Sequence, residues 1–173
     1  DTLAAMISGS TLLPGQRAIG YVKTLGGTKE ACVVGTRIVT TAVNAALANG
    51  IFGHADETDD SHPASITHPG SAIVPAALAM AERDRRDGTA LLRAIVLGYD
   101  LCARLTLSLN PMDLSLRGHH PPCFGDLFGA AAAAGALARL DAQRVRYMLS
   151  YTAQQAAGVA GAAWRGPRGG GCR

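Results

Sequence analysis

The chain has 173 residues, of which 48% are hydrophobic and 17% are charged, and its formal net charge is +3 at pH 7. This length suits one domain rather than two, and the low share of charged residues indicates extensive burial or a subunit interface. Because no basic stripe is interleaved with aromatic residues and no apolar run reaches about 18 residues, we expect neither nucleic-acid binding nor a membrane span.

The four cysteines are widely spaced and form no CxxC pair; they are Cys32, Cys102, Cys123 and Cys172. This spacing argues against a zinc knuckle or an iron–sulfur cluster. Reduced thiols are typical of a cytoplasmic protein, which is the location that we expect.

Helical periodicity dominates the chain, and no strand of convincing length is predicted. In chain order, the helical segments that we expect are 1–7, 12–24, 36–52, 72–86, 89–107, 124–140 and 141–160. Residues 30–34 give a weak extended signal. Thr89 and Asp141 are expected to cap the helices that follow them. The alanine-rich faces at 42–48 and 130–138 indicate close helix packing, so the sequence predicts an all-α bundle.

Two loops interrupt these helices, and in each a histidine precedes a proline directly before a new helix. The pairs are His68–Pro69 and His120–Pro121. Unsatisfied N–H groups at a helix start favour an anion and tend to keep a nearby imidazole neutral. Two such histidines would suit a carboxylate-bearing substrate, whereas ordinary loop histidines before turns remain the alternative.

The first loop, GHADETDDSHPASITHPGSA at 53–72, gathers carboxylates and histidines and allows three interpretations. One is a metal site for a hydrolase within 54–68, although no recurring ligand spacing is present. Another is a metal-free acid–base site, in which carboxylates orient the histidines. The third is a solvated acidic loop without chemistry.

The order of the segments decides between them. HADETDDSHPASITHPGSAIVPAALAMAE, followed by GHHPPCFGDLFGAAAAAGALARLD and YTAQQAAG, resembles the MmgE/PrpD family from about residue 1 to Trp164. That resemblance implies the larger helical domain of the family fold, a homodimer, and chemistry without a cofactor or a metal. It implies a lyase-type enzyme that acts on a small di- or tricarboxylate, with dehydration of the 2-methylcitrate type as the first expectation.

The resemblance also implies site residues. His68 matches the histidine of the HPG motif and His120 that of the FHP motif, while Glu57 and Ser61 stand where an aspartate and a threonine are usual. These four are the expected catalytic residues. For substrate binding we expect Asp60 and Arg117, and for loop structure Asp59 and His62.

The resemblance further implies that the helical domain, 1–163, is truncated at both ends and that a lid domain is absent. The glycine- and arginine-rich tail, 164–173, is expected to be disordered or frameshifted. Because a lysine and a tyrosine of the family's site would lie beyond this chain, we expect the isolated chain to be inactive or nearly so. A non-catalytic helical scaffold for dimerisation therefore stays an alternative.

Overall fold

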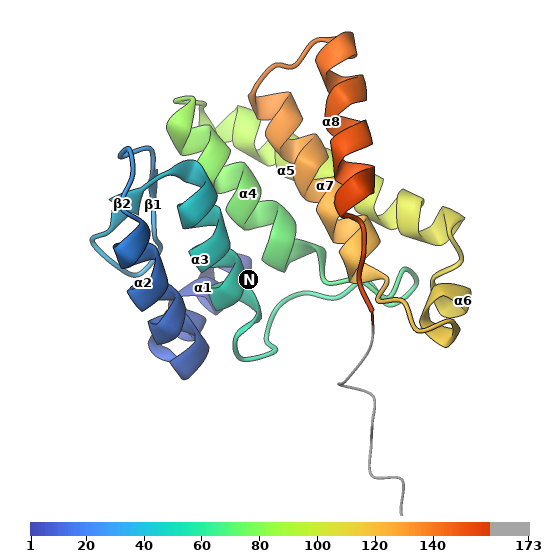
Figure 1. The fold of residues 1–173 in the computed structure, drawn as a ribbon, viewed down its shortest axis with the longest axis horizontal. Coiled ribbons are helices and arrows are strands. Elements are labelled where there is room, and N and C mark those ends of the chain that lie inside the picture. Colours follow the sequence, from blue (N-terminus) through green and yellow to red (C-terminus); the bar gives the residue numbers. More distant parts are fainter. Residues whose placement is uncertain (160–173) are drawn as a thin grey trace, which may run out of the picture.

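A computed structural model describes residues 1–159, which form eight helices and one two-stranded sheet (Figure 1). The helices are α1 Thr2–Thr11, α2 Leu13–Leu25, α3 Ala42–His54, α4 Pro69–Arg83, α5 Gly88–Ser108, α6 Pro111–Leu116, α7 Pro122–Leu137 and α8 Ala142–Gln155. Strands β1 Ala31–Cys32 and β2 Val39–Thr40 pair antiparallel. The predicted all-α fold class is confirmed.

Helix α4 lies between two apolar clusters, as its central place in Figure 1 shows. On one side Ala79 packs with α1, α2, α3 and β1, whose largest buried side chains are Met6 and Phe52. On the other side Ile73 and Ala77 pack with α5 and α7. Burial on both sides fixes α4, and with it the loop that leads into α4.

Helices α5 and α7 cross with their backbones in near contact at Gly98 and Gly129. A Cβ atom added at Gly98 would lie 2.8 Å from the Gly129 carbonyl oxygen, and one added at Gly129 would lie 2.6 Å from that of Gly98. Real Cβ atoms do not approach so closely, so this crossing requires glycine on both helices.

The helix expected from Thr36 begins only at Ala42, so its first part was wrongly predicted. Residues Val39 and Thr40 pair with β1 instead, and the Thr41 side chain then caps α3 by accepting a hydrogen bond from the Asn44 N–H at 3.2 Å. The apolar residues before Ala42 fit a helical period as well as a short strand, and pairing with β1 decides between them.

Other helix ends differ from the prediction by a few residues. Asp87, rather than Thr89, caps α5 by accepting a hydrogen bond from Ala90 N–H, because the helix already begins at Gly88. The predicted cap Asp141 is confirmed at the start of α8. The short helix α6 lies where a loop was expected, and Asn110 caps it.

The two loops meet on one side of the molecule. In Figure 1 the loop after α3 runs beneath α4 towards the start of α7. The second loop is joined to the segment after α8, because His120 N–H donates to the Gly158 carbonyl at 3.1 Å. Within 1–159 no helix is long and apolar enough to cross a membrane. The tail expected at 164–173 lies outside the described residues.

Candidate active site

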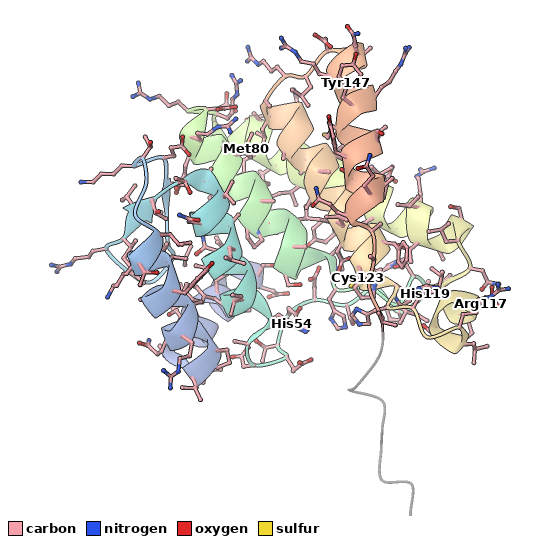
Figure 2. The ribbon with its side chains drawn as sticks, in the orientation of Figure 1. His54, Met80, Arg117, His119, Cys123 and Tyr147 are labelled. Atoms are coloured by element: carbon pink, nitrogen blue, oxygen red, sulfur yellow. The ribbon has the colours of Figure 1, made fainter. Side chains whose placement is uncertain are left out.

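A pocket of about 640 Å³ opens where α3 ends, where α4 and α7 begin, and where the chain leaves α8. Its titratable lining comprises His54, Glu57, His68, His120, Cys123 and Asp126. Figure 2 shows His54 and Cys123 at the ends of α3 and α7 on the same side of the molecule. Three of the five histidines of the chain therefore border one cavity.

His68 is the residue before α4, and the structure fixes its ring. Its Nδ1 atom lies 3.1 Å from the backbone carbonyl oxygen of Asp60. Because a carbonyl oxygen only accepts hydrogen bonds, Nδ1 carries the proton, and Nε2 of the neutral ring is left as the proton acceptor. The Ser71 hydroxyl donates to the His68 carbonyl at 2.9 Å and closes the first turn.

Asp60 holds the start of α4 rather than lining the pocket. Its Oδ1 atom accepts a hydrogen bond from the Gly70 N–H at 2.8 Å. Burial, and then the hydrogen bond and charge of Asp60, raise the pKa of Tyr99. The substrate-binding role expected for Asp60 stays a prediction, and its observed contacts are those of a residue that shapes the loop.

His54, which lines the pocket, contacts the buried side chain of Asp59. Nδ1 of His54 lies 2.9 Å from Oδ2 of Asp59, whose side chain is only 1% exposed. The same oxygen lies 3.8 Å from Nδ1 of His68, and the two imidazole centroids are 5.7 Å apart. In the sequence, His54 stands out only as the first residue of the 54–68 stretch considered for metal binding, because its contact with Asp59 depends on how the loop folds back.

Glu57 lines the pocket beside His54, with its Oε1 atom 3.7 Å from His54 Nε2. Its backbone has a φ of 57°, a left-handed conformation that is uncommon for a residue with a side chain. The turn therefore aims this expected catalytic carboxylate at the pocket, although 76% of the side chain is exposed.

His120 borders the pocket from the second loop. Its Nδ1 atom lies 3.4 Å from Sγ of Cys123, in the first turn of α7. Burial, followed by the nearby rings of His68 and His54, holds the pKa of His120 below its ordinary value. Burial, and then Asp126, raise the pKa of the Cys123 thiol. Both groups are therefore favoured in their neutral forms.

Asp126 is a buried carboxyl group of α7 that sequence reasoning missed. Burial raises its pKa to about 6, even though the Cys102 thiol, the backbone N–H of His68 and the His68 ring all favour the charged form. The Cys102 Sγ atom lies 3.2 Å from Asp126 Oδ1. A lone aspartate between Gly125 and the alanine-rich face was the available signal, because a helix that packs tightly rarely buries a carboxylate without cause.

The remaining predicted site residues lie outside the lining of this pocket. Ser61 is exposed on the first loop. His62 turns to the other side of that loop, where its Nδ1 atom lies 2.7 Å from the Ser65 hydroxyl. Arg117 pairs with Asp113 on α6 at 2.9 Å, and Figure 2 shows it at the edge of the molecule, away from His54. The catalytic role of Ser61 and the substrate-binding role of Arg117 stay predictions.

Metal ligation was one interpretation of the first loop. Among residues 1–159, no group of three or more His, Cys, Asp or Glu side chains is arranged to hold a metal ion. His54 and His68 direct their Nδ1 atoms to oxygen atoms of the loop itself. The geometry therefore gives the hydrolase alternative no ligand set in this part of the chain.

Two helix N-termini meet at the pocket, which suits an anionic ligand. Ser71 and Ala72 in the first turn of α4 and Cys123 in that of α7 all line it. The positive end of a helix dipole stabilises a carboxylate by about 0.3–1 kcal/mol at an exposed site. Neither lysine nor arginine is among the described lining residues, so the histidines are the titratable cationic groups of this wall.

This all-α domain brings histidines, carboxyl groups and helix N-termini together at one pocket. The family model of the MmgE/PrpD N-terminal domain matches residues 1–166, and the chain belongs to this family. The resemblance read from the sequence is thus confirmed.

Two curated relatives are similar over part of their length. The chain is 32% identical over 162 residues to cis-aconitate decarboxylase of Homo sapiens, a match that covers 90% of this chain and 33% of the human protein. It is 36% identical over 103 residues to the cis-aconitate decarboxylase-like protein oryM of Aspergillus oryzae, covering 56% of this chain and 21% of that protein. The chain therefore spans about a third or less of the relatives that it matches.

Proposed function

We propose that this chain supplies the histidine-bearing wall of a lyase-type active site that acts on a small di- or tricarboxylate by acid–base chemistry. One observation supports it above the others: His68 and His120 border a single pocket at the starts of two helices. Nδ1–H of His68 donates a hydrogen bond to the Asp60 carbonyl oxygen, which leaves Nε2 of the His68 ring to accept a proton.

The proposed chemistry needs one group that accepts a proton and one that donates it. In a dehydration, His68 would take the proton from a carbon next to a carboxylate, and the hydroxyl group would leave as water after protonation by an acid. In a decarboxylation, the bond to a carboxylate carbon breaks, CO₂ leaves, and an acid gives a proton to carbon. Positioned acid–base groups contribute about 10²–10⁴-fold to such steps.

His120 and Asp126 are the proposed acid-side groups. Because burial raises the pKa of Asp126 to about 6, a fraction of this carboxyl group keeps its proton near neutral pH. His120, whose pKa is held below its ordinary value, would act as a neutral hydrogen-bond donor or acceptor to the substrate. Dehydration of 2-methylcitrate stays a prediction, and the names of both relatives favour decarboxylation of cis-aconitate as the reaction to test beside it.

A binding experiment on the 173-residue chain tests the proposal. Cis-aconitate and 2-methylcitrate are titrated in turn while the side-chain signals of the five histidines are followed by NMR. We expect the signals of His68 and His120 to move and that of His62, which lies outside the pocket, to stay. The same samples are then analysed for CO₂ release and for loss of water.

His68→Ala and His120→Ala are expected to weaken carboxylate binding, whereas His62→Ala serves as the control on the same loop. If neither acid moves any pocket histidine, or if His62 responds as strongly as His68, the proposal is wrong. In that case the scaffold alternative gains. A homodimer and a cytoplasmic location likewise stay predictions, the former open to light scattering on the purified chain.

A further inference from the structure

We propose that His54 and Asp59 form a histidine–carboxylate pair that supplies a second proton acceptor to the pocket, beside His68. The inference rests on the proposed function for its substrate, a small carboxylate, but the pair itself is defined by geometry alone. Nδ1 of His54 lies 2.9 Å from Oδ2 of Asp59, within hydrogen-bonding distance.

The proton between these two groups belongs to the imidazole. A carboxylate has no hydrogen to donate, so the neutral ring must present Nδ1–H to Asp59, and its Nε2 atom is left with a lone pair. That Nε2 atom lies beside Glu57 at 3.7 Å, and both residues line the pocket. The free acceptor nitrogen is thus on the pocket side, and the carboxylate is on the buried side.

Burial makes Asp59 suited to this task. Its side chain is 1% exposed, and its Oδ1 atom is buried without a hydrogen-bond partner in the described structure. A buried carboxylate that lacks other donors holds the imidazole to which it is hydrogen-bonded in one orientation and one tautomer. This assigns Asp59 a part in orienting His54, beyond the loop-structuring role expected from the sequence.

His68 shows that the two acceptors are built differently. Its Nδ1 proton goes to the uncharged carbonyl oxygen of Asp60 at 3.1 Å, while the Asp59 carboxylate is farther away at 3.8 Å. The titratable groups that face His54 are Asp59, Glu57 and, across 5.7 Å between ring centroids, His68. His120 also lies on the same pocket.

Asp59→Asn tests whether the Asp59 carboxylate fixes the tautomer of His54. The amide that replaces the carboxylate has one oxygen atom and one NH₂ group. If the oxygen took the place of Oδ2, the NH₂ group would lie at the place of Oδ1, where no acceptor is present, and would be buried without a partner. We therefore expect the NH₂ group to face His54 and to donate to Nδ1. The neutral His54 ring then carries its proton on Nε2 and loses its acceptor on the pocket side.

The measurement is the tautomer of each histidine in the ¹⁵N-labelled 173-residue chain, read from long-range ¹⁵N–¹H correlations at a pH where the rings are neutral. We expect Nδ1–H for both His54 and His68 in the unmodified chain. Asp59→Asn should convert His54 to Nε2–H and leave His68 unchanged. The matched control is Asp56→Asn on the same loop, since Asp56 bonds to Ser8 and Thr58 instead.

If Asp59→Asn fails to fold, the tautomer of His54 in the unmodified chain still shows whether His54 and Asp59 are paired. An Nε2–H tautomer of His54 in that chain would overturn the inference, and so would a folded Asp59→Asn variant that keeps Nδ1–H. The acceptor role is tested separately by exchange of carbon-bound protons of 2-methylcitrate for deuterium in D₂O. Any residual exchange that the unmodified chain catalyses should fall in His54→Gln to the rate of a sample without protein, and a catalysed rate kept at the unmodified level would overturn the role.

Failure of the proposed function gives a different result. If the unmodified chain neither binds a carboxylate nor exchanges its protons, the proposed function is wrong, and the tautomers still show whether His54 and Asp59 are paired. Intact binding with an unpaired His54 would instead remove the inference alone.

Discussion

The two histidine–proline junctions have the same pattern in the sequence but different surroundings in the structure. At the first, Asp60 of the preceding loop holds both parts of the junction: its carboxylate accepts a hydrogen bond from Gly70 N–H at the helix start, and its backbone carbonyl oxygen contacts the His68 ring. At the second, the loop is held by a backbone hydrogen bond from His120 to Gly158, and the ring meets the thiol of Cys123.

This difference teaches that the residue before a helix acquires its chemistry from the loop that precedes it. His68 has a ring proton fixed by a carbonyl oxygen, which only accepts. His120 faces a thiol that burial keeps neutral, and a neutral thiol both donates and accepts weakly. The contacts at the first junction thus fix which ring nitrogen of His68 is free to accept a proton. At the second junction the thiol fixes neither tautomer of His120, so the tautomer can follow the substrate.

Asp126 joins the two junctions, and its removal should have the largest effect. Its pKa is raised from 3.8 to about 6, so its contribution to stability is complete below about pH 4 and is lost as the pH rises through 6. Each unit of pKa shift corresponds to about 1.36 kcal/mol. Loss of the contribution of Asp126 should therefore lower the free energy of unfolding by about 2–3 kcal/mol as the pH rises from about 4 to above 6. Asp126→Asn should remove that fall.

Urea denaturation at pH 4 and pH 8 measures the difference. The control is Asp100→Asn on α5, since Asp100 is an exposed partner of Arg104 and has no part in the pocket. If the chain and its Asp126→Asn variant lose stability in parallel between the two pH values, the assignment of a buried, protonated Asp126 is wrong.

Gly70→Ala should disturb the first junction alone. A Cβ atom there would meet the Asp60 carboxylate, lie 2.6 Å from the Thr2 hydroxyl and lie 2.8 Å from the Tyr99 hydroxyl. Overpacking of this kind costs about 1–3 kcal/mol. We expect thermal unfolding at a lower temperature and a changed His68 signal in NMR, with the His120 signal retained.

Gly20→Ala is the matched control, because nothing lies within 4 Å of a Cβ atom at that position in α2. There the same substitution should stabilise the protein by about 0.5–1 kcal/mol, since alanine favours a helix more than glycine does. Equal changes in stability at the two glycines would show that the close contacts of Gly70 do not limit the size of the residue at that position.

The smallest predicted effect is electrostatic and runs from the first junction to the second. His68→Gln should raise the pKa of His120 towards its ordinary value, because the charge of His68 is one of the causes that lower it. The main cause, burial, stays in place, so the shift is partial. An NMR titration measures it, with His62→Gln as control; a lowered pKa of His120 would contradict the arrangement.

Local sequence signals predicted much of the fold. The all-α class, both helix starts after His68 and His120, and the Asp141 cap depend on helical spacing, proline geometry and capping, all of which act within a few residues. The start of α3 was missed because Val39 and Thr40 pair with residues seven and nine positions away in the chain.

The site was only partly predictable for the same reason. His68, His120 and Glu57 were found through the family motifs and do line the pocket. The pairing of His54 with Asp59 and the burial of Asp126 arise when α3, α4 and α7 come together, and no periodicity or spacing reports that. Tertiary contact, rather than residue type, makes these groups candidates for chemistry.

The glycine crossing of α5 and α7 has a mechanical consequence for this pocket. Because the two backbones touch at Gly98 and Gly129, with the Ile73 side chain packed beside both glycines, α5 and α7 have little room to shift against each other there. The α7 wall is thereby fixed to α5 as a rigid frame. A substrate in this pocket would therefore meet a fixed α7 wall, which carries Cys123 and Asp126.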